Sequence, residues 1–165
     1  MRFTRRSFIA AATSGMVALA GCLGDDEATI SLLASSFDPR VVWIGVGETV
    51  LFEHESGAHT VTLFHEDNDV IQRSPVTATA FDEEINSGSI DQPFDTEGIH
   101  GIFCRPHEQA GMACAVVVGD YDDEEPGLAT PQEELPGAMQ DTLASINKEI
   151  LEGEPANGGG GTGPY

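Results

Sequence analysis

The segment Cys104–Met112, CRPHEQAGM, places a thiol, an imidazole and a thioether within nine positions and runs directly into the apolar stretch ACAVVVG. His107 follows the cysteine by three positions, and Met112 follows His107 by five. Three donor side chains this close together converge only where a strand ends and a tight loop turns around one point. The chain must therefore end one strand at this loop, start another behind it, and bring any fourth donor from a distant segment.

His59 is the best-placed fourth donor. It opens the alternating stretch HTVTLFH directly after the turn ESGA, which lets its ring face the end of the core where Cys104 arrives. His54 is close enough in sequence to compete with His59 for this role. A disulfide between Cys104 and Cys114 is the alternative to a metal site, but it leaves the spacing of the other donors without a reason. We therefore expect Cys114 to be a buried free thiol.

One thiolate, two imidazoles and one thioether are the donors of a type 1 copper site, where the methionine lies at a longer axial distance. Zinc favours further thiolates or a carboxylate, and iron–sulfur clusters need more cysteines than this chain offers. We therefore predict that one copper ion is bound by His59, Cys104, His107 and Met112. Four protein ligands leave no open position for a substrate, so we do not expect an enzyme.

Short β-rich runs separated by turn signals fill residues 28–120. The stretch VVWIGVGETVLFEH contains two such runs broken at Gly45–Glu48, and ACAVVVG is an entirely apolar closing strand. The acidic stretch Glu66–Gly88 alternates poorly and is predicted to be a loop with a short helical piece. Many short strands at close spacing predict an all-β fold, a β-sandwich with Greek-key connections.

The composition changes after Gly119. Residues 121–133 form an acidic, proline-bearing linker, residues 134–152 an amphipathic helix, and residues 153–165 a glycine-rich tail that we expect to be disordered. The apolar stripe of the helix has spacings of four, three and four, and consists of Met139, Leu143, Ile146 and Ile150. We expect this stripe to pack on the domain; binding to a partner is the alternative.

Residues 1–21 have the architecture of a signal peptide, with a basic start and an apolar stretch of small residues. Arg5 and Arg6 resemble a twin-arginine signal, and LAGC resembles a lipobox that makes Cys22 the lipid-modified first residue of the mature chain. An ordinary secretory signal and cleavage without a lipid are the alternatives. Either way, we expect the mature domain to work outside the cytoplasm. With the lipid on Cys22, a tether of residues 22–27 holds it at the extracytoplasmic face of the membrane.

The charge balance is extreme, with 28 acidic residues against seven lysines and arginines and a formal net charge of -21. This charge excludes a nucleic-acid-binding protein. A dense carboxylate surface is either a solvated face that maintains solubility or an adaptation to very high salt, where counterions screen the self-repulsion. We favour the halophilic interpretation.

The motifs SGAHTVTL and GIHGIFCRPHEQAGMACAVVVG together resemble a cupredoxin of the plastocyanin, pseudoazurin and halocyanin group. The spacing of Cys104, His107 and Met112 is similar to the pseudoazurin ligand loop, and VGETVLFEHESGAHTV resembles the strand that leads to the first histidine. The resemblance covers residues 28–119 and implies a cupredoxin fold and single-electron transfer by a blue copper site. With the export signal and the acidity, it indicates a haloarchaeal halocyanin-like protein.

These features together predict a membrane-tethered, monomeric electron carrier whose redox partners are respiratory components of the membrane. We expect His107 to meet them through a small apolar surface near Ala58, Pro106, Ala110 and Gly111. A copper-delivery protein with the same ligands and a cupredoxin-fold interaction module without metal are the alternatives.

Some positions depart from the pattern of the family. Thr60 stands where the family commonly has asparagine, so its backbone amide can point at the Cys104 sulfur but the side-chain bridge between the ligand segments must differ. His100 stands where tyrosine is usual, and we expect it to be a hydrogen-bonded core residue. We expect His65 to lie at a strand end in water, and Arg105, between two ligands, to have acids within pairing distance.

Overall fold

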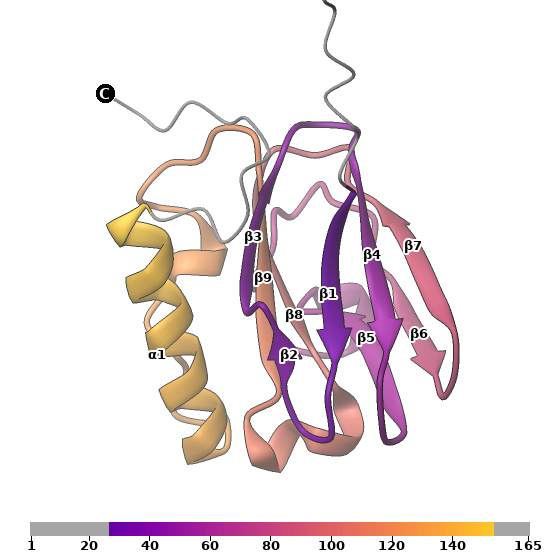
Figure 1. Cartoon of the computed structure of the whole chain (residues 1–165). Coiled ribbons are helices and arrows are strands. Elements are labelled where there is room, and N and C mark those ends of the chain that lie inside the picture. The colour runs from indigo at the N-terminus through magenta and orange to yellow at the C-terminus, as the bar shows by residue number, and fades with distance from the viewer. Residues whose placement is uncertain (1–26, 154–165) are drawn as a thin grey trace, which may run out of the picture.

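The computed structural model describes residues 27–153, which form two β-sheets and one C-terminal helix (Figure 1). The strands are β1 (Ala28–Leu32), β2 (Phe37–Asp38), β3 (Val41–Ile44), β4 (Thr49–His54), β5 (His59–Leu63), β6 (Asp82–Ile85), β7 (Ser89–Pro93), β8 (Gly98–Phe103) and β9 (Ala113–Val118). The helical elements are the 3-10 turns η1 (Glu66–Asn68), η2 (Arg105–Ala110) and η3 (Pro126–Leu128), and the α-helix α1 (Gly137–Glu152).

The strands are divided between a four-stranded sheet of order β2-β1-β4-β7 and a five-stranded sheet of order β3-β9-β8-β5-β6. The pairs β1–β4 and β3–β9 are parallel, and the remaining pairs are antiparallel. The two sheets face each other across a shared core (Figure 1). This arrangement confirms the predicted all-β sandwich.

The central strands β5, β8 and β9 of the five-stranded sheet are buried on both faces, which explains why β9 is apolar at every position. Cys114, Val116 and Val118 point into the core between the sheets, whereas Ala113, Ala115 and Val117 point into a second core. Helix α1 covers that second core (Figure 1). We call the first the inner core and the second the outer core.

Helix α1 packs on the sheet through the stripe predicted from its sequence. All four residues of the stripe are buried in the outer core: Met139, Leu143, Ile146 and Ile150. The helix begins after Pro136 and ends at Gly153, whose positive φ of 69° lets the chain leave the last turn. The alternative of a free, partner-binding stripe is therefore excluded.

The expectation of a loop with a short helical piece between Glu66 and Gly88 is wrong in part. Its helical piece is η1, but Asp82–Ile85 form strand β6 at the edge of the five-stranded sheet, where β6 pairs with β5. The acidic side chains on β6 are exposed, and only Ile85 is buried. An edge strand keeps charges in water, so it need not show the apolar alternation of a central strand.

Arg73 joins the segment before α1 to the sheet. Its guanidinium is buried and donates to the carbonyl oxygens of Gly127 (2.8 Å) and Ala129 (2.9 Å). It also reaches the side-chain oxygens of Gln132 and Asn147, each at 3.3 Å. No carboxylate pairs with it among the described residues, and burial lowers the pKa of Arg73 to about 10. Residues 127–132 of the predicted linker are therefore held against the domain by hydrogen bonds.

The signal peptide, Cys22 and most of the glycine-rich tail lie outside the described residues. Within residues 27–153, no helix has the length and apolarity needed to cross a membrane.

Candidate metal centre

His59 opens strand β5 with its ring held in one tautomer. The Nε2–H group donates to the carbonyl oxygen of Ser56 at 2.6 Å, which leaves the lone pair of Nδ1 free. That Nδ1 lies 3.6 Å from the Sγ of Cys104. Burial lowers the pKa of His59, although its bond to Ser56 acts in the opposite direction. The lowered pKa favours the neutral imidazole, whose Nδ1 presents a donor atom toward the thiol.

Cys104 follows the last residue of β8, and its side chain is fully buried. The backbone amide of Thr60 lies 3.5 Å from its Sγ, as the sequence predicted. Burial raises the pKa of the Cys104 thiol, while hydrogen bonds from Thr60 and His107 lower it. A metal must therefore displace the thiol proton, and the Thr60 amide is already in place to stabilise the thiolate.

The ligand loop runs from Cys104 to Met112 and contains η2. Hydrogen bonds between its own backbone groups close the loop. The Cys104 amide donates to the carbonyl of Met112 at 3.0 Å, and the Met112 amide donates to the carbonyl of His107 at 3.2 Å. Pro106 occupies the first turn, and Gly111 ends it with a φ of 74°, which favours glycine. These bonds bring the two ends of CRPHEQAGM together and place Met112 in the inner core beside Cys104.

Three predicted donors converge on one point. The Nδ1 of His107 lies 3.3 Å from the Cys104 Sγ, and the rings of His59 and His107 are 4.9 Å apart between centroids. The donor atoms of these three residues all lie within 4.8 Å of one another, and no carboxylate joins them within residues 27–153. Two imidazoles, a buried thiol and the neighbouring thioether of Met112 fit copper better than zinc, and the four residues are positioned as a type 1 copper site.

The other histidines and Cys114 lie outside this cluster. His54 directs its Nε2 to the carbonyl of Gly57 and does not compete with His59. His100 is buried and bonds to the carbonyl of Thr96 at 2.8 Å, as expected. Cys104 and Cys114 are both free, so the disulfide alternative is excluded.

The expectation for His65 is wrong, because only 3% of its surface is exposed. Its Nδ1 accepts from the Asp67 amide at 3.2 Å, and its Nε2 lies 3.3 Å from the carbonyl of Val76. His65 thus caps η1 from a buried position. Its place two residues after β5 gave no sign that the following loop folds back over the ring.

The predicted apolar surface around His107 is smaller than expected. Ala58, Pro106 and Ala110 are exposed, and His107 is half-buried. Gly111, however, is buried, and a side chain there would meet the carbonyl of Ala138 in the first turn of α1. The helix therefore covers one flank of the ligand loop, a contact between segments that no local sequence pattern could indicate.

Sequence reasoning missed the side-chain hydrogen bonds that join Thr60 to Thr62 and Thr62 to Asp82 on β6. Thr60 and Thr62 are both buried, and Thr62 bonds to Asp82 at 2.8 Å. Asp82 also pairs with Arg105 at 2.8 Å, which confirms that Arg105 meets an acid. The only available signal was two threonines at alternate positions in an otherwise apolar strand.

Residues 27–119 match the family of copper-binding proteins described as the plastocyanin/azurin family. The chain is 34% identical to a plastocyanin of Scenedesmus fuscus over 98 residues, which are 56% of this chain and 99% of that protein. It is 32% identical to a halocyanin of Natronomonas pharaonis over 101 residues, 58% of each chain. Among solved structures, the pseudoazurin of Methylobacterium extorquens AM1 superposes with a TM-score of 0.62 and 26% identity, covering 76% of this chain and 99% of that one.

Proposed function

Because this chain belongs to the copper-binding plastocyanin/azurin family, whose members carry electrons and are not enzymes, we propose that it is a membrane-tethered carrier of single electrons. We place it at the outer face of the cell membrane. The observation that carries the proposal is the approach of two imidazole Nδ1 atoms to the buried Cys104 thiol, at 3.3 and 3.6 Å. A carrier needs such a site, in which the fold itself brings the donor atoms together.

Each ligand residue has a separate task. Bound copper supplies a centre that accepts and releases one electron at a time. Cys104 and His59, both buried, would hold that centre, and the hydrogen bond to the Ser56 carbonyl orients the His59 ring. Met112 supplies a thioether from the closing end of the loop. Because backbone bonds fix the loop, its residues need little rearrangement when the charge of the site changes.

His107 gives electrons their way in and out. It is the only partly exposed member of the three-donor cluster, and the small apolar residues beside the ligands in sequence, Ala58, Pro106 and Ala110, are exposed. A small apolar surface suits brief redox encounters with a protein partner, which bury little area. Respiratory proteins of the membrane are the partners we propose, and the chain acts as a monomer.

The tether we propose starts at Cys22, where LAGC provides a lipid attachment motif. The described domain begins with β1 at the end of the sandwich away from η2 (Figure 1). A tether of residues 22–27 would therefore leave the ligand loop facing away from the membrane, toward partners that project from it. Cys22→Ser should release the full chain from the membrane fraction, and retention of that variant in the membrane would contradict the tether.

We further propose that the protein is a halocyanin-like protein of a haloarchaeon. The supporting observations are the 28 acidic residues against seven basic ones and the similarity to the Natronomonas halocyanin. Self-repulsion of this charge opposes the compact state at low ionic strength, and molar salt reduces the screening length to about 3 Å. The free energy of unfolding should therefore rise from 0.1 M to molar KCl. A protein that is equally stable across this range would contradict halophilic adaptation.

Voltammetry of the copper-loaded protein tests the carrier function directly. A carrier gives a reversible one-electron wave with fast exchange and keeps its copper when a Cu(I) chelator is added. A copper-delivery protein, the alternative with the same ligands, gives up Cu(I) readily to the chelator. Rapid transfer of Cu(I) together with slow, irreversible electron exchange would contradict the proposal.

A further inference from the structure

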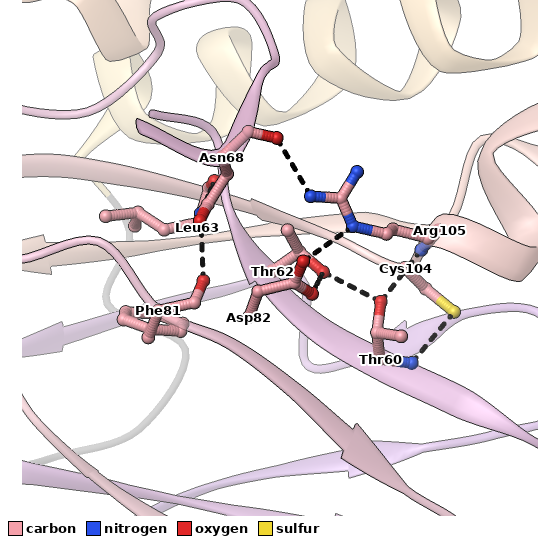
Figure 2. A network of polar contacts seen from close by, with 8 residues as sticks. All are labelled: Thr60, Thr62, Leu63, Asn68, Phe81, Asp82, Cys104 and Arg105. Atoms are coloured by element: carbon pink, nitrogen blue, oxygen red, sulfur yellow. Dashed lines mark hydrogen bonds and ion pairs between the residues drawn. The ribbon is translucent and has the colours of Figure 1, made fainter. Parts of the chain in front are cut away.

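A closed ring of polar contacts lies directly behind the thiol of Cys104 (Figure 2). It begins at the backbone amide of Arg105, which donates to the Thr60 hydroxyl at 2.9 Å. The Thr60 and Thr62 hydroxyls are 2.8 Å apart, and Thr62 donates to the carboxylate of Asp82 at 2.8 Å. The other oxygen of Asp82 accepts from the Arg105 Nε at 2.8 Å, which returns the ring to its starting residue.

The carboxylate of Asp82 fixes the direction of both hydroxyl groups. A carboxylate only accepts, so the single proton of the Thr62 hydroxyl must point toward Asp82. The proton between the two threonines must then come from Thr60, since Thr62 has none left to donate. This leaves a lone pair of the Thr60 oxygen directed at the Arg105 amide.

Thr60 connects the ring to the copper-binding thiol of Cys104. The backbone amide of Thr60 points at the Cys104 Sγ, while its hydroxyl holds the residue that follows Cys104 (Figure 2). Both hydroxyls of the ring are buried, with Thr62 completely inaccessible and Thr60 7% exposed. Two contacts from one residue thus set the separation between β5 and the start of the ligand loop.

Arg105, the exposed member of the ring, makes a further contact outside it. The Arg105 guanidinium also donates to the carbonyl of Asn68 at 2.9 Å. The Asn68 side chain in turn donates to the carbonyls of Leu63 (2.9 Å) and Phe81 (3.0 Å), which join β5 to the segment before β6. The ion pair is therefore part of a framework that a free surface pair lacks.

We propose that Asp82 and Thr62 are positioning residues for the copper thiolate, acting through Thr60. The inference rests on the copper site of the proposed function. The ring holds the Thr60 amide against the sulfur, and an N–H group there stabilises the more negative, reduced state of the site and raises its reduction potential. Asp82 and Thr62 influence the site without touching any of its four ligands.

Thr62→Val is the cleanest test, because it removes one buried hydroxyl while retaining size and charge. We expect the reduction potential to fall and copper affinity, measured by competition with a chromophoric Cu(I) chelator, to weaken on the order of tenfold. Thr62→Ser retains the hydroxyl and should restore both values to those of the parent protein. Equal changes in the valine and serine variants would assign the effect to packing and overturn the proposal.

Asp82→Asn tests the surface end and stays informative if the valine variant fails to fold. Glu83→Gln is its matched control, because Glu83 is the next residue along β6, is exposed and loses the same charge. Glu83 is opposite Val61 in the strand register, so its side chain lies on the other face of β6 from Asp82 and the two threonines. Removing a negative charge raises the potential slightly in both variants, and breaking the ring lowers it only in the first. We therefore expect the potential of Asp82→Asn to lie below that of Glu83→Gln.

Equal potentials in these two variants would overturn the proposal, as would a lowered melting temperature in Thr62→Val with unchanged potential and affinity. The absorption spectrum of the copper-loaded parent protein tests the copper site separately from the positioning role of Asp82 and Thr62. If the parent shows no thiolate-to-copper absorption band, the copper site itself has failed. If the parent shows the band and the variants match their controls, only the positioning role has failed.

Discussion

The two cores on either side of the five-stranded sheet differ in what they contain. The inner core, between the sheets, holds Cys104, Met112 and Cys114 among its aliphatic and aromatic residues. The outer core, under α1, contains only aliphatic and aromatic side chains apart from Met139. One face of the five-stranded sheet thus borders the metal-binding residues, and the other face borders only packing contacts with α1. The difference predicts that changes to the donor residues of the inner core alter the metal site, whereas changes in the outer core alter stability alone.

The two cysteines of the inner core give the largest expected effect. Cys104→Ser should abolish the blue absorption of the copper-loaded protein, since it removes the thiolate from the cluster. Cys114→Ser should leave the absorption largely intact, because Cys114 lies outside the donor cluster. Absorption spectra of the two variants with equal copper content make the comparison. Equal bleaching in both would show that the thiolate is wrongly assigned.

Shortening Met139 tests the outer core. Met139→Ala should reduce the free energy of unfolding by about 2–5 kcal/mol, because the side chain is fully buried between α1 and the five-stranded sheet. The visible spectrum of the copper-loaded variant should remain that of the parent. Leu151→Ala is the control on the same helix, since Leu151 is 62% exposed and should change stability by less than about 0.5 kcal/mol. A changed spectrum in Met139→Ala would show that the two cores are coupled.

Substituting Arg73 tests the buried hydrogen bonds that hold the segment before α1. Arg73→Met should cost about 2 kcal/mol of unfolding free energy, measured by denaturant titration, because it leaves the carbonyl of the buried Gly127 without its donor. Arg40→Met removes the same charge from an exposed position and should have little effect. A loss of equal size in both variants would assign the effect to net charge.

His100 gives the smallest expected effect, a change in pH dependence. Burial lowers the pKa of His100 below its usual 6.5, against its bond to Thr96. The unfolded chain therefore takes up the proton first, so stability is present above pH 6.5 and is lost as the pH falls below it. His100→Gln should weaken this loss by less than about 1.4 kcal/mol per pH unit, the limit for one proton. Unfolding curves of both proteins from pH 7.5 to 5 measure it, and identical slopes would contradict it.

Local patterns predicted the parts of the molecule that repeat or cluster in sequence. The donors Cys104, His107 and Met112 lie in one loop, and the stripe of α1 follows a helical period, so both were visible in the chain. His59 was predicted because a strand of alternating residues begins with it. These features depend on neighbours in sequence, and the structure places them as expected.

The parts that were missed depend on contacts between distant segments. Strand β6 is acidic because it is an edge, and its Asp82 meets Arg105 from 23 residues away. Gly111 is covered by Ala138, which belongs to a helix beyond the domain's last strand. Thr60 was recognised as a departure from the family, but its replacement bridge through Thr62 could be seen only in three dimensions.

The absorption spectrum of the copper-loaded protein in high salt tests the central claim most directly. His59, Cys104, His107 and Met112 as ligands predict an intense blue thiolate-to-copper band at one copper per chain. A protein that binds one copper ion per chain and shows no such band would contradict the type 1 site and, with it, the proposed carrier of electrons.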